Sequence, residues 1–178
     1  NDMVTFKRLL DIGVQNLLVP YIQTAEEARN AVAYTRYPPH GVRGYAGAPR
    51  ASNYGRVKDY AHLNAKELCL LLQVETLQGL ENLEAIANVD GVDGVFIGPG
   101  DLSAALGHLG NPKHPDVLKV IDDAIARIKV CGKAPGILTG DEALAKHYVA
   151  QGCLFVAVGA DQNVLRDSAT ALAQRFKS

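Results

Sequence analysis

The segment GVFIGPGDLS, residues 94–103, is decisive for the fold because a short apolar run leads through Gly and Pro into a helical pattern. Similar apolar runs recur along the chain as NLLVP (16–20), LCLLLQVE (68–75), APGIL (134–138) and LFVAVG (154–159). None of these runs alternates strictly between apolar and polar residues, and continuous apolar runs are typical of strands buried on both faces of a parallel sheet. The sequence therefore predicts five such strands.

Longer amphipathic segments separate the predicted strands. The expected helices cover residues 3–11, 24–34, 77–87, 115–130, 140–150 and 161–176. Thr24 and Glu27 are spaced as a capping box at one helix start. Alternating helices and strands indicate an α/β fold with a parallel sheet. Five strands fit either an open flavodoxin-like sheet or part of a TIM (β/α)8 barrel, and residues 1–178 are expected to form a single domain.

The composition is that of an ordinary globular protein, with 48% hydrophobic and 21% charged residues. A net charge of −1 gives no electrostatic basis for binding nucleic acid or an anionic membrane. No apolar run reaches the roughly 18 residues that a transmembrane helix needs. The three cysteines, Cys69, Cys131 and Cys153, form no C-x-x-C pair and are expected to be buried thiols in a reducing compartment.

Residues 37–60, YPPHGVRGYAGAPRASNYGRVKDY, interrupt the alternation of strands and helices. This segment is rich in Gly, Pro, Arg and Tyr and has no hydrophobic periodicity. Structureless segments of this length are often functional or form interfaces. A surface loop that covers one end of the fold is an equally good interpretation.

Two successive predicted strands end in a carboxylate, Glu75 and Asp101. Ligands of α/β proteins bind beyond the carboxyl ends of the strands, and adjacent strands lie about 4.8 Å apart. The two carboxylates can therefore share a divalent cation such as Mg²⁺ or Mn²⁺, which prefers oxygen ligands. Two structural alternatives stay open, because Glu75 could complement a helix macrodipole and Asp101 could be an N-cap. Asp161 is expected to be an N-cap or a first-turn acid.

Gly98-Pro99-Gly100 lies between a strand and a helix, as phosphate-binding loops do, but neither G-K-[ST] nor G-x-G-x-x-G is present. We expect these glycines to let the backbone approach a small carboxylate ligand, whose oxygens accept N–H groups at a helix start. The five histidines form no H-E-x-x-H or comparable ligand set, and none is an evident general base.

Several longer strings resemble one known family. RYPPHGVRG (36–44), LLLQVET (70–76), DGVDGVFIGPGDLS (90–103), GKAPGIL (132–138) and LFVAVGAD (154–161) are similar to the HpcH/HpaI family of metal-dependent 2-oxo-acid aldolases. The resemblance extends over residues 1–176. It implies a TIM barrel, with this chain resembling the fourth to eighth strands. It also implies a lyase that reversibly cleaves 4-hydroxy-2-oxo acids into pyruvate and an aldehyde.

The resemblance assigns roles to individual residues. It implies that Glu75 and Asp101 ligate a divalent metal (Mg²⁺, Mn²⁺ or Co²⁺) that stabilises the pyruvate enolate. The residues implied to bind substrate are Gln73, Gly100 through its backbone N–H, Asp101, Leu138 near the pyruvate methyl, and Tyr45 at the aldehyde end. Asp11 matches an aspartate that supports the basicity of a catalytic histidine.

Two catalytic segments of the family have no counterpart in residues 1–178: a D-G-E-H segment with the histidine base, and a strand that ends in an enolate-stabilising arginine. At ~30 residues per βα unit, the resemblance implies roughly 75–90 residues before Asn1. The alternatives are a non-catalytic metal- or pyruvate-binding module and a CoA-ester lyase of the citrate lyase β type. A cytoplasmic location is expected, and the resemblance implies a homo-oligomer, specifically a hexamer.

Overall fold

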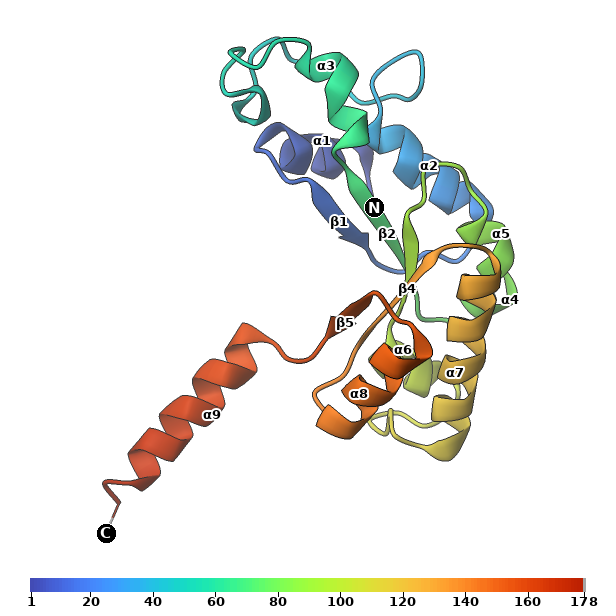
Figure 1. Ribbon diagram of the computed structural model, residues 1–178, viewed down its shortest axis with the longest axis vertical. Coiled ribbons are helices and arrows are strands. Elements are labelled where there is room, and N and C mark those ends of the chain that lie inside the picture. Colours follow the sequence, from blue (N-terminus) through green and yellow to red (C-terminus); the bar gives the residue numbers. More distant parts are fainter. Residues whose placement is uncertain (178) are drawn as a thin grey trace.

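The computed structural model describes residues 1–177, and these contain a five-stranded parallel sheet whose strands follow the order of the sequence. The strands are β1 (Asn16–Val19), β2 (Cys69–Val74), β3 (Gly94–Ile97), β4 (Ala134–Leu138) and β5 (Phe155–Ala157). Figure 1 shows the strands curling away from a layer that includes α2 (Ala25–Thr35), α5 (Leu83–Ala87) and α7 (Pro115–Val130). The predicted α/β fold, with this chain forming part of a TIM barrel, is confirmed.

The remaining helices complete the alternation. They are α1 (Met3–Asp11), α3 (Tyr60–Leu63), α4 (Leu77–Glu81), α6 (Pro99–Ala105), α8 (Glu142–Gln151) and α9 (Asp161–Gln174), with short 3-10 helices η1 (Arg50–Ser52) and η2 (Asn64–Lys66). Side chains of the strands and the helix layer form one core that includes Leu72, Val95, Ile97 and Ile125.

The two faces of the sheet are covered unequally. In β2, buried residues alternate with partly exposed ones, and in β1 they alternate with exposed ones such as Leu18, which is 41% exposed. Leu72 packs into the core on the helix side, whereas Leu71 and Gln73 face the concave side and are partly exposed. The prediction that every strand is buried on both faces is therefore wrong for β1 and β2. It is also wrong for β5, which contains no buried residue, and for the exposed end of β4 at Leu138. Only β3, in the middle of the sheet, is buried throughout.

Local signals set most helix boundaries correctly. The predicted capping box is present at the start of α2, where Thr24 accepts from the Glu27 N–H and the Glu27 carboxylate accepts from the Thr24 N–H. The predicted helix 77–87 is instead divided into α4 and α5 at Asn82. The Asn82 side chain donates to the Gln23 carbonyl oxygen over 2.9 Å, a contact across 59 residues that local periodicity does not encode.

The segment 37–60 packs at the amino-terminal end of β1 and β2. It leads through η1 into α3 and η2, which precede β2 directly. Arg43, whose side chain is fully buried, donates to Asp11 at the end of α1 and to Asn64. The segment is therefore anchored to the fold by a buried guanidinium, in agreement with a loop that covers one end of the sheet.

The last helix, α9, extends away from the sheet in Figure 1. It contains no buried residue, and Val164, Leu165 and Leu172 are exposed. Among residues 1–177, no helix has the length and apolar character that crossing a membrane would require.

Candidate metal and substrate site

The Glu75 carboxylate lies directly after β2 and is held on two sides. Its Oε1 accepts from the backbone N–H of Tyr21 over 2.9 Å, and its Oε2 accepts from the Gln73 side-chain amide over 2.5 Å. Tyr21 directs its N–H to this carboxylate from a left-handed backbone conformation with φ 60°. The residue is only 3% exposed, so its orientation is fixed by the fold.

The macrodipole alternative for Glu75 does not account for these contacts. The N-cap of α4 is Thr76, whose hydroxyl accepts from the Gly79 N–H over 3.0 Å. The Glu75 side chain points instead toward β1 and β3.

Gly98 provides the space that the Glu75 carboxylate occupies. The register of β2 and β3 pairs Gln73 with Phe96 and Val74 with Ile97, so one further residue places Glu75 beside Gly98. A Cβ at position 98 would lie 2.4 Å from Glu75 Oε2 and 2.8 Å from Glu75 Cβ. We expected this glycine to admit a ligand, but here it admits a carboxylate of the protein itself.

Asp101 contributes the second carboxylate. It lies in the first turn of α6, whose N-cap is Gly98, so the alternative that Asp101 is the N-cap is wrong. Burial raises the pKa of the Glu75 carboxyl, and the neighbouring Asp101 adds to this increase, although hydrogen bonds from Gln73 and the Tyr21 N–H oppose it. A cation between two such carboxylates would remove their mutual repulsion.

Gly100 and Leu138 line one cavity of about 440 Å³ with Pro99, Lys113 and Asp141. Gly100 lies in the first turn of α6, where backbone N–H groups have no acceptor within the helix. Leu138 ends β4 and is partly exposed toward the concave side of the sheet. Lys113 donates to Asp141 over 2.5 Å at the edge of this cavity.

Asp11 and Tyr45 lie elsewhere. Asp11 forms ion pairs with Lys7 and Arg43 at the amino-terminal end of the sheet. Burial alone would raise the pKa of Asp11, but hydrogen bonds from Arg43 and Lys7 outweigh it and lower this pKa. Tyr45 is exposed and packs edge-on against Tyr37. The described chain does not bring either residue to Glu75, so their assigned roles stay predictions.

One cluster was not anticipated from the sequence. His108, His114 and Asp116, in and after the loop between α6 and α7, have potential ligand atoms within 4.8 Å of one another. The spacing H-x5-H-x-D was the available signal, and it was missed because it matches no established ligand motif.

Comparisons with known proteins agree with this geometry. Residues 1–168 match the HpcH/HpaI aldolase/citrate lyase family. A 4-hydroxy-2-oxo-heptane-1,7-dioate aldolase of Salmonella paratyphi A is 56% identical over 177 residues, covering 99% of this chain and 67% of that protein. A pyruvate aldolase of Rhizobium etli is 57% identical over 176 residues, covering 99% of this chain and 69% of that protein.

A solved structure gives the same result. The crystal structure of an HpcH/HpaI aldolase/citrate lyase family protein from Burkholderia cenocepacia J2315 superposes with a TM-score of 0.91 at 39% identity, covering 99% of this chain and 70% of that one. The names of the sequence relatives support aldol cleavage by a lyase as the function. The chain belongs to the HpcH/HpaI aldolase/citrate lyase family.

Proposed function

We propose that this chain binds pyruvate and a divalent cation at Glu75 and Asp101, within a lyase that cleaves 4-hydroxy-2-oxo acids into pyruvate and an aldehyde. The observation that carries the proposal is the Glu75 carboxylate, which is buried, held by two hydrogen bonds and fitted against Gly98. Its two hydrogen-bond donors are a backbone N–H and a side-chain amide, neither of them a cationic group. Here its charged neighbour is another carboxylate, Asp101.

The residues present fit Mg²⁺, Mn²⁺ or Co²⁺. Two carboxylates leave coordination positions for water and substrate oxygens, which is how Mg²⁺ is usually held, and oxygen ligands accept all three ions. Such a cation supplies Lewis-acid stabilisation of the negative charge that develops on pyruvate.

The other site residues are proposed to bind and orient pyruvate. The Gly100 N–H would donate to the pyruvyl carboxylate, and Leu138 would pack against the methyl group. Gln73 already fixes one oxygen of Glu75 through its amide. In the cleavage, the C3–C4 bond breaks, its electron pair stays on C3 as the enolate, and the 4-hydroxyl loses its proton. The histidine base that the family resemblance implies has no matching motif in residues 1–178, so we assign that proton transfer to none of the residues described.

Variants of the full-length protein test this function. Glu75→Gln and Asp101→Asn are expected to abolish metal-dependent pyruvate release from 4-hydroxy-2-oxo-heptane-1,7-dioate. Glu142→Gln serves as the matched control, because Glu142 is an exposed acid whose ion-pair partner within residues 1–177 is Lys146. Turnover at the wild-type rate in either site variant would refute the proposal. CoA thioesters assayed in parallel test the alternative of a citrate lyase β-type enzyme, and cation binding without turnover by the wild type would favour the non-catalytic module.

We also infer that the protein acts as a cytoplasmic homo-oligomer in which residues 1–178 form one domain. Exposed apolar residues on α9 support association of chains, because exposed apolar surface of this kind marks interaction sites. They are Val164, Leu165 and Leu172. A hexamer is the expected state, and light scattering of the full-length protein measures it directly.

A further inference from the structure

The loop between α6 and α7 brings together two histidines and an aspartate that the proposed reaction does not use. The rings of His108 and His114 are stacked with their centroids 3.5 Å apart and their planes at 13°. The Asp116 carboxylate lies beside both rings, with its Oδ2 3.7 Å from His108 Nε2 and 3.6 Å from His114 Nδ1. Among the described residues, no member of this cluster hydrogen-bonds to Glu75 or lines the cavity of Gly100 and Leu138.

The backbone of the loop fixes the positions of the two histidines. The His108 N–H donates to the Ser103 carbonyl oxygen over 2.7 Å, and the His114 N–H donates to the Asn111 carbonyl oxygen over 3.1 Å. Between them, the Asn111 N–H donates to the His108 carbonyl oxygen over 2.9 Å. The imidazoles are therefore attached to an ordered turn. To admit an ion, the rings must rotate, and an ion at His114 Nδ1 would replace the Asp116 N–H from which this nitrogen accepts.

Two of the three distances between the ligand atoms are close to those around a small transition-metal ion, and the third is within 4.8 Å. In a tetrahedral zinc site with ligands at 2.0–2.2 Å, neighbouring ligand atoms lie roughly 3.3–3.6 Å apart. Asp116 Oδ2 already lies at 3.7 and 3.6 Å from the two imidazole nitrogens. Stacked rings must turn before both nitrogens can face one ion, and side-chain exposures of 27% for His108 and 33% for His114 leave room for that rotation.

A purely structural role explains only part of the cluster. His114 is the N-cap of α7, and its Nδ1 accepts from the Asp116 N–H over 3.2 Å. Asp116 is also a first-turn acid, which the helix dipole favours. Neither role requires His108, whose ring is brought against the cap from the other end of the loop.

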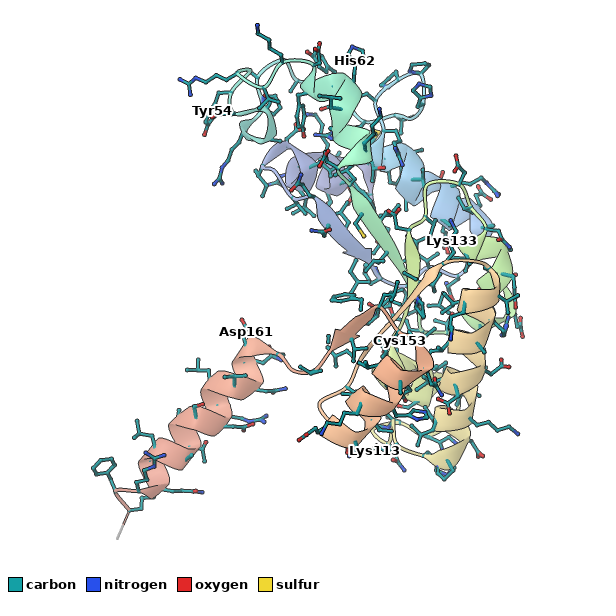
Figure 2. The ribbon with its side chains drawn as sticks, in the orientation of Figure 1. Tyr54, His62, Lys113, Lys133, Cys153 and Asp161 are labelled. Carbon is teal, nitrogen blue, oxygen red and sulfur yellow. The ribbon has the colours of Figure 1, made fainter. Side chains whose placement is uncertain are left out.

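We propose that His108, His114 and Asp116 form a second cation site, selective for ions of the zinc class. Two imidazole nitrogens and one carboxylate favour Zn²⁺, Co²⁺, Ni²⁺ or Cu²⁺, whereas the oxygen ligands of Glu75 and Asp101 favour Mg²⁺ and Mn²⁺. The residue before His114 is Lys113, labelled in Figure 2, which lines the cavity of Gly100 and Leu138. Lys113 also pairs with Asp141, the N-cap of α8. A bound ion would hold this loop at the edge of the cavity.

Zinc titration of the full-length protein carrying Glu75→Gln and Asp101→Asn tests the second site without the first. Calorimetry is expected to show one Zn²⁺ bound per chain, with excess Mg²⁺ failing to compete. His108→Ala, His114→Asn and Asp116→Asn are each expected to weaken binding by roughly tenfold or more, since even indirect partners of a metal contribute about that much. His114→Asn keeps an N-cap acceptor, so loss of affinity there reports the imidazole rather than the helix.

The matched control is His147→Ala. His147 also faces an aspartate, with its Nε2 3.1 Å from Asp122 Oδ1, but lies in no three-ligand cluster among the described residues. Its removal is expected to leave Zn²⁺ affinity unchanged. The proposal is overturned by the absence of stoichiometric Zn²⁺ binding, by unchanged affinity in His108→Ala, or by an equal loss in His147→Ala. The titrated protein already carries Glu75→Gln and Asp101→Asn. A lack of Zn²⁺ binding would therefore not count against the proposed aldolase site.

Discussion

Replacing Gly98 by alanine tests whether the Glu75 carboxylate must lie where the structure places it. The new Cβ would stand 2.4 Å from Glu75 Oε2, and ordinary van der Waals contact begins at 3.4 Å. The methyl group would also stand 2.8 Å from Glu75 Cβ, so a turn of the carboxylate tip alone does not relieve the overlap. The buried side chain has to shift as a whole.

The expected effect follows from the size of that shift. The carboxylate oxygen must move by about 1 Å, and a misplacement of this size costs on the order of 100-fold in activity. Overpacking in a well-packed region destabilises a protein by about 1–3 kcal/mol. Gly98→Ala is therefore expected to lose both Mn²⁺ affinity and aldol cleavage while the protein remains folded.

Gly94→Ala separates loss of the site from loss of stability. Gly94 lies at the opposite end of the same strand, β3, and its Cβ would stand 2.4 Å from the Ala134 carbonyl oxygen. Because this overlap is with the backbone, we expect at least as large a loss of stability in urea unfolding as for Gly98→Ala, but unchanged Mn²⁺ affinity in calorimetry. The reasoning is refuted if Gly98→Ala binds Mn²⁺ and turns over like the wild type, or if both variants lose Mn²⁺ equally.

Three further predictions concern the surroundings of the site and the fold. A proline at position 21 has no N–H donor and cannot adopt φ 60°. Tyr21→Pro should therefore lower the free energy of unfolding by more than about 1 kcal/mol and weaken Mn²⁺ binding, whereas Tyr21→Gly should retain that binding. Equal Mn²⁺ affinities of the two variants would contradict this. The Arg127 guanidinium lowers the pKa of Glu84 to about 2, so Glu84→Gln should cost at most about 1 kcal/mol at neutral pH, because the pair is partly exposed. That difference should shrink as the pH of urea unfolding falls from 4.5 toward 2, and a constant difference would count against the ion pair. Gly136→Ala places a Cβ 2.8 Å from Phe96 Cδ2. It should lower the free energy of unfolding in urea by about 1–3 kcal/mol. An unchanged urea midpoint would show that the Phe96 ring moves freely.

Local sequence signals predicted much of the fold. The helix over 115–130 was bounded correctly because its apolar stripe and proline start are local features. Asp161 is the first-turn acid that was expected. The break at Asn82 depends on a contact with Gln23, and contacts across 59 residues leave no periodic signal.

The sequence predicted only part of the arrangement around Glu75. Glu75 and Asp101 were predicted to lie together because carboxylates after neighbouring strands meet at one edge of the sheet. The structure makes them neighbours, and their role as metal ligands stays a prediction. The contributions of Tyr21 and Gly98 could not be predicted from the sequence, because they depend on how β1, β2 and β3 lie side by side. Tyr21 acts through its backbone N–H, and Gly98 acts through the absence of a side chain. Asp11 lies at the far end of the sheet, a position that family resemblance alone did not reveal.

The most direct test of the central claim is a crystal structure of the full-length protein grown with Mn²⁺ and pyruvate, with Mn²⁺ located by its anomalous scattering. We predict an anomalous peak in direct contact with carboxylate oxygens of Glu75 and Asp101, with pyruvate on the same ion and its carboxylate at the Gly100 N–H. Bound pyruvate with no anomalous peak between Glu75 and Asp101, or an ion held there that does not contact pyruvate, would contradict the account.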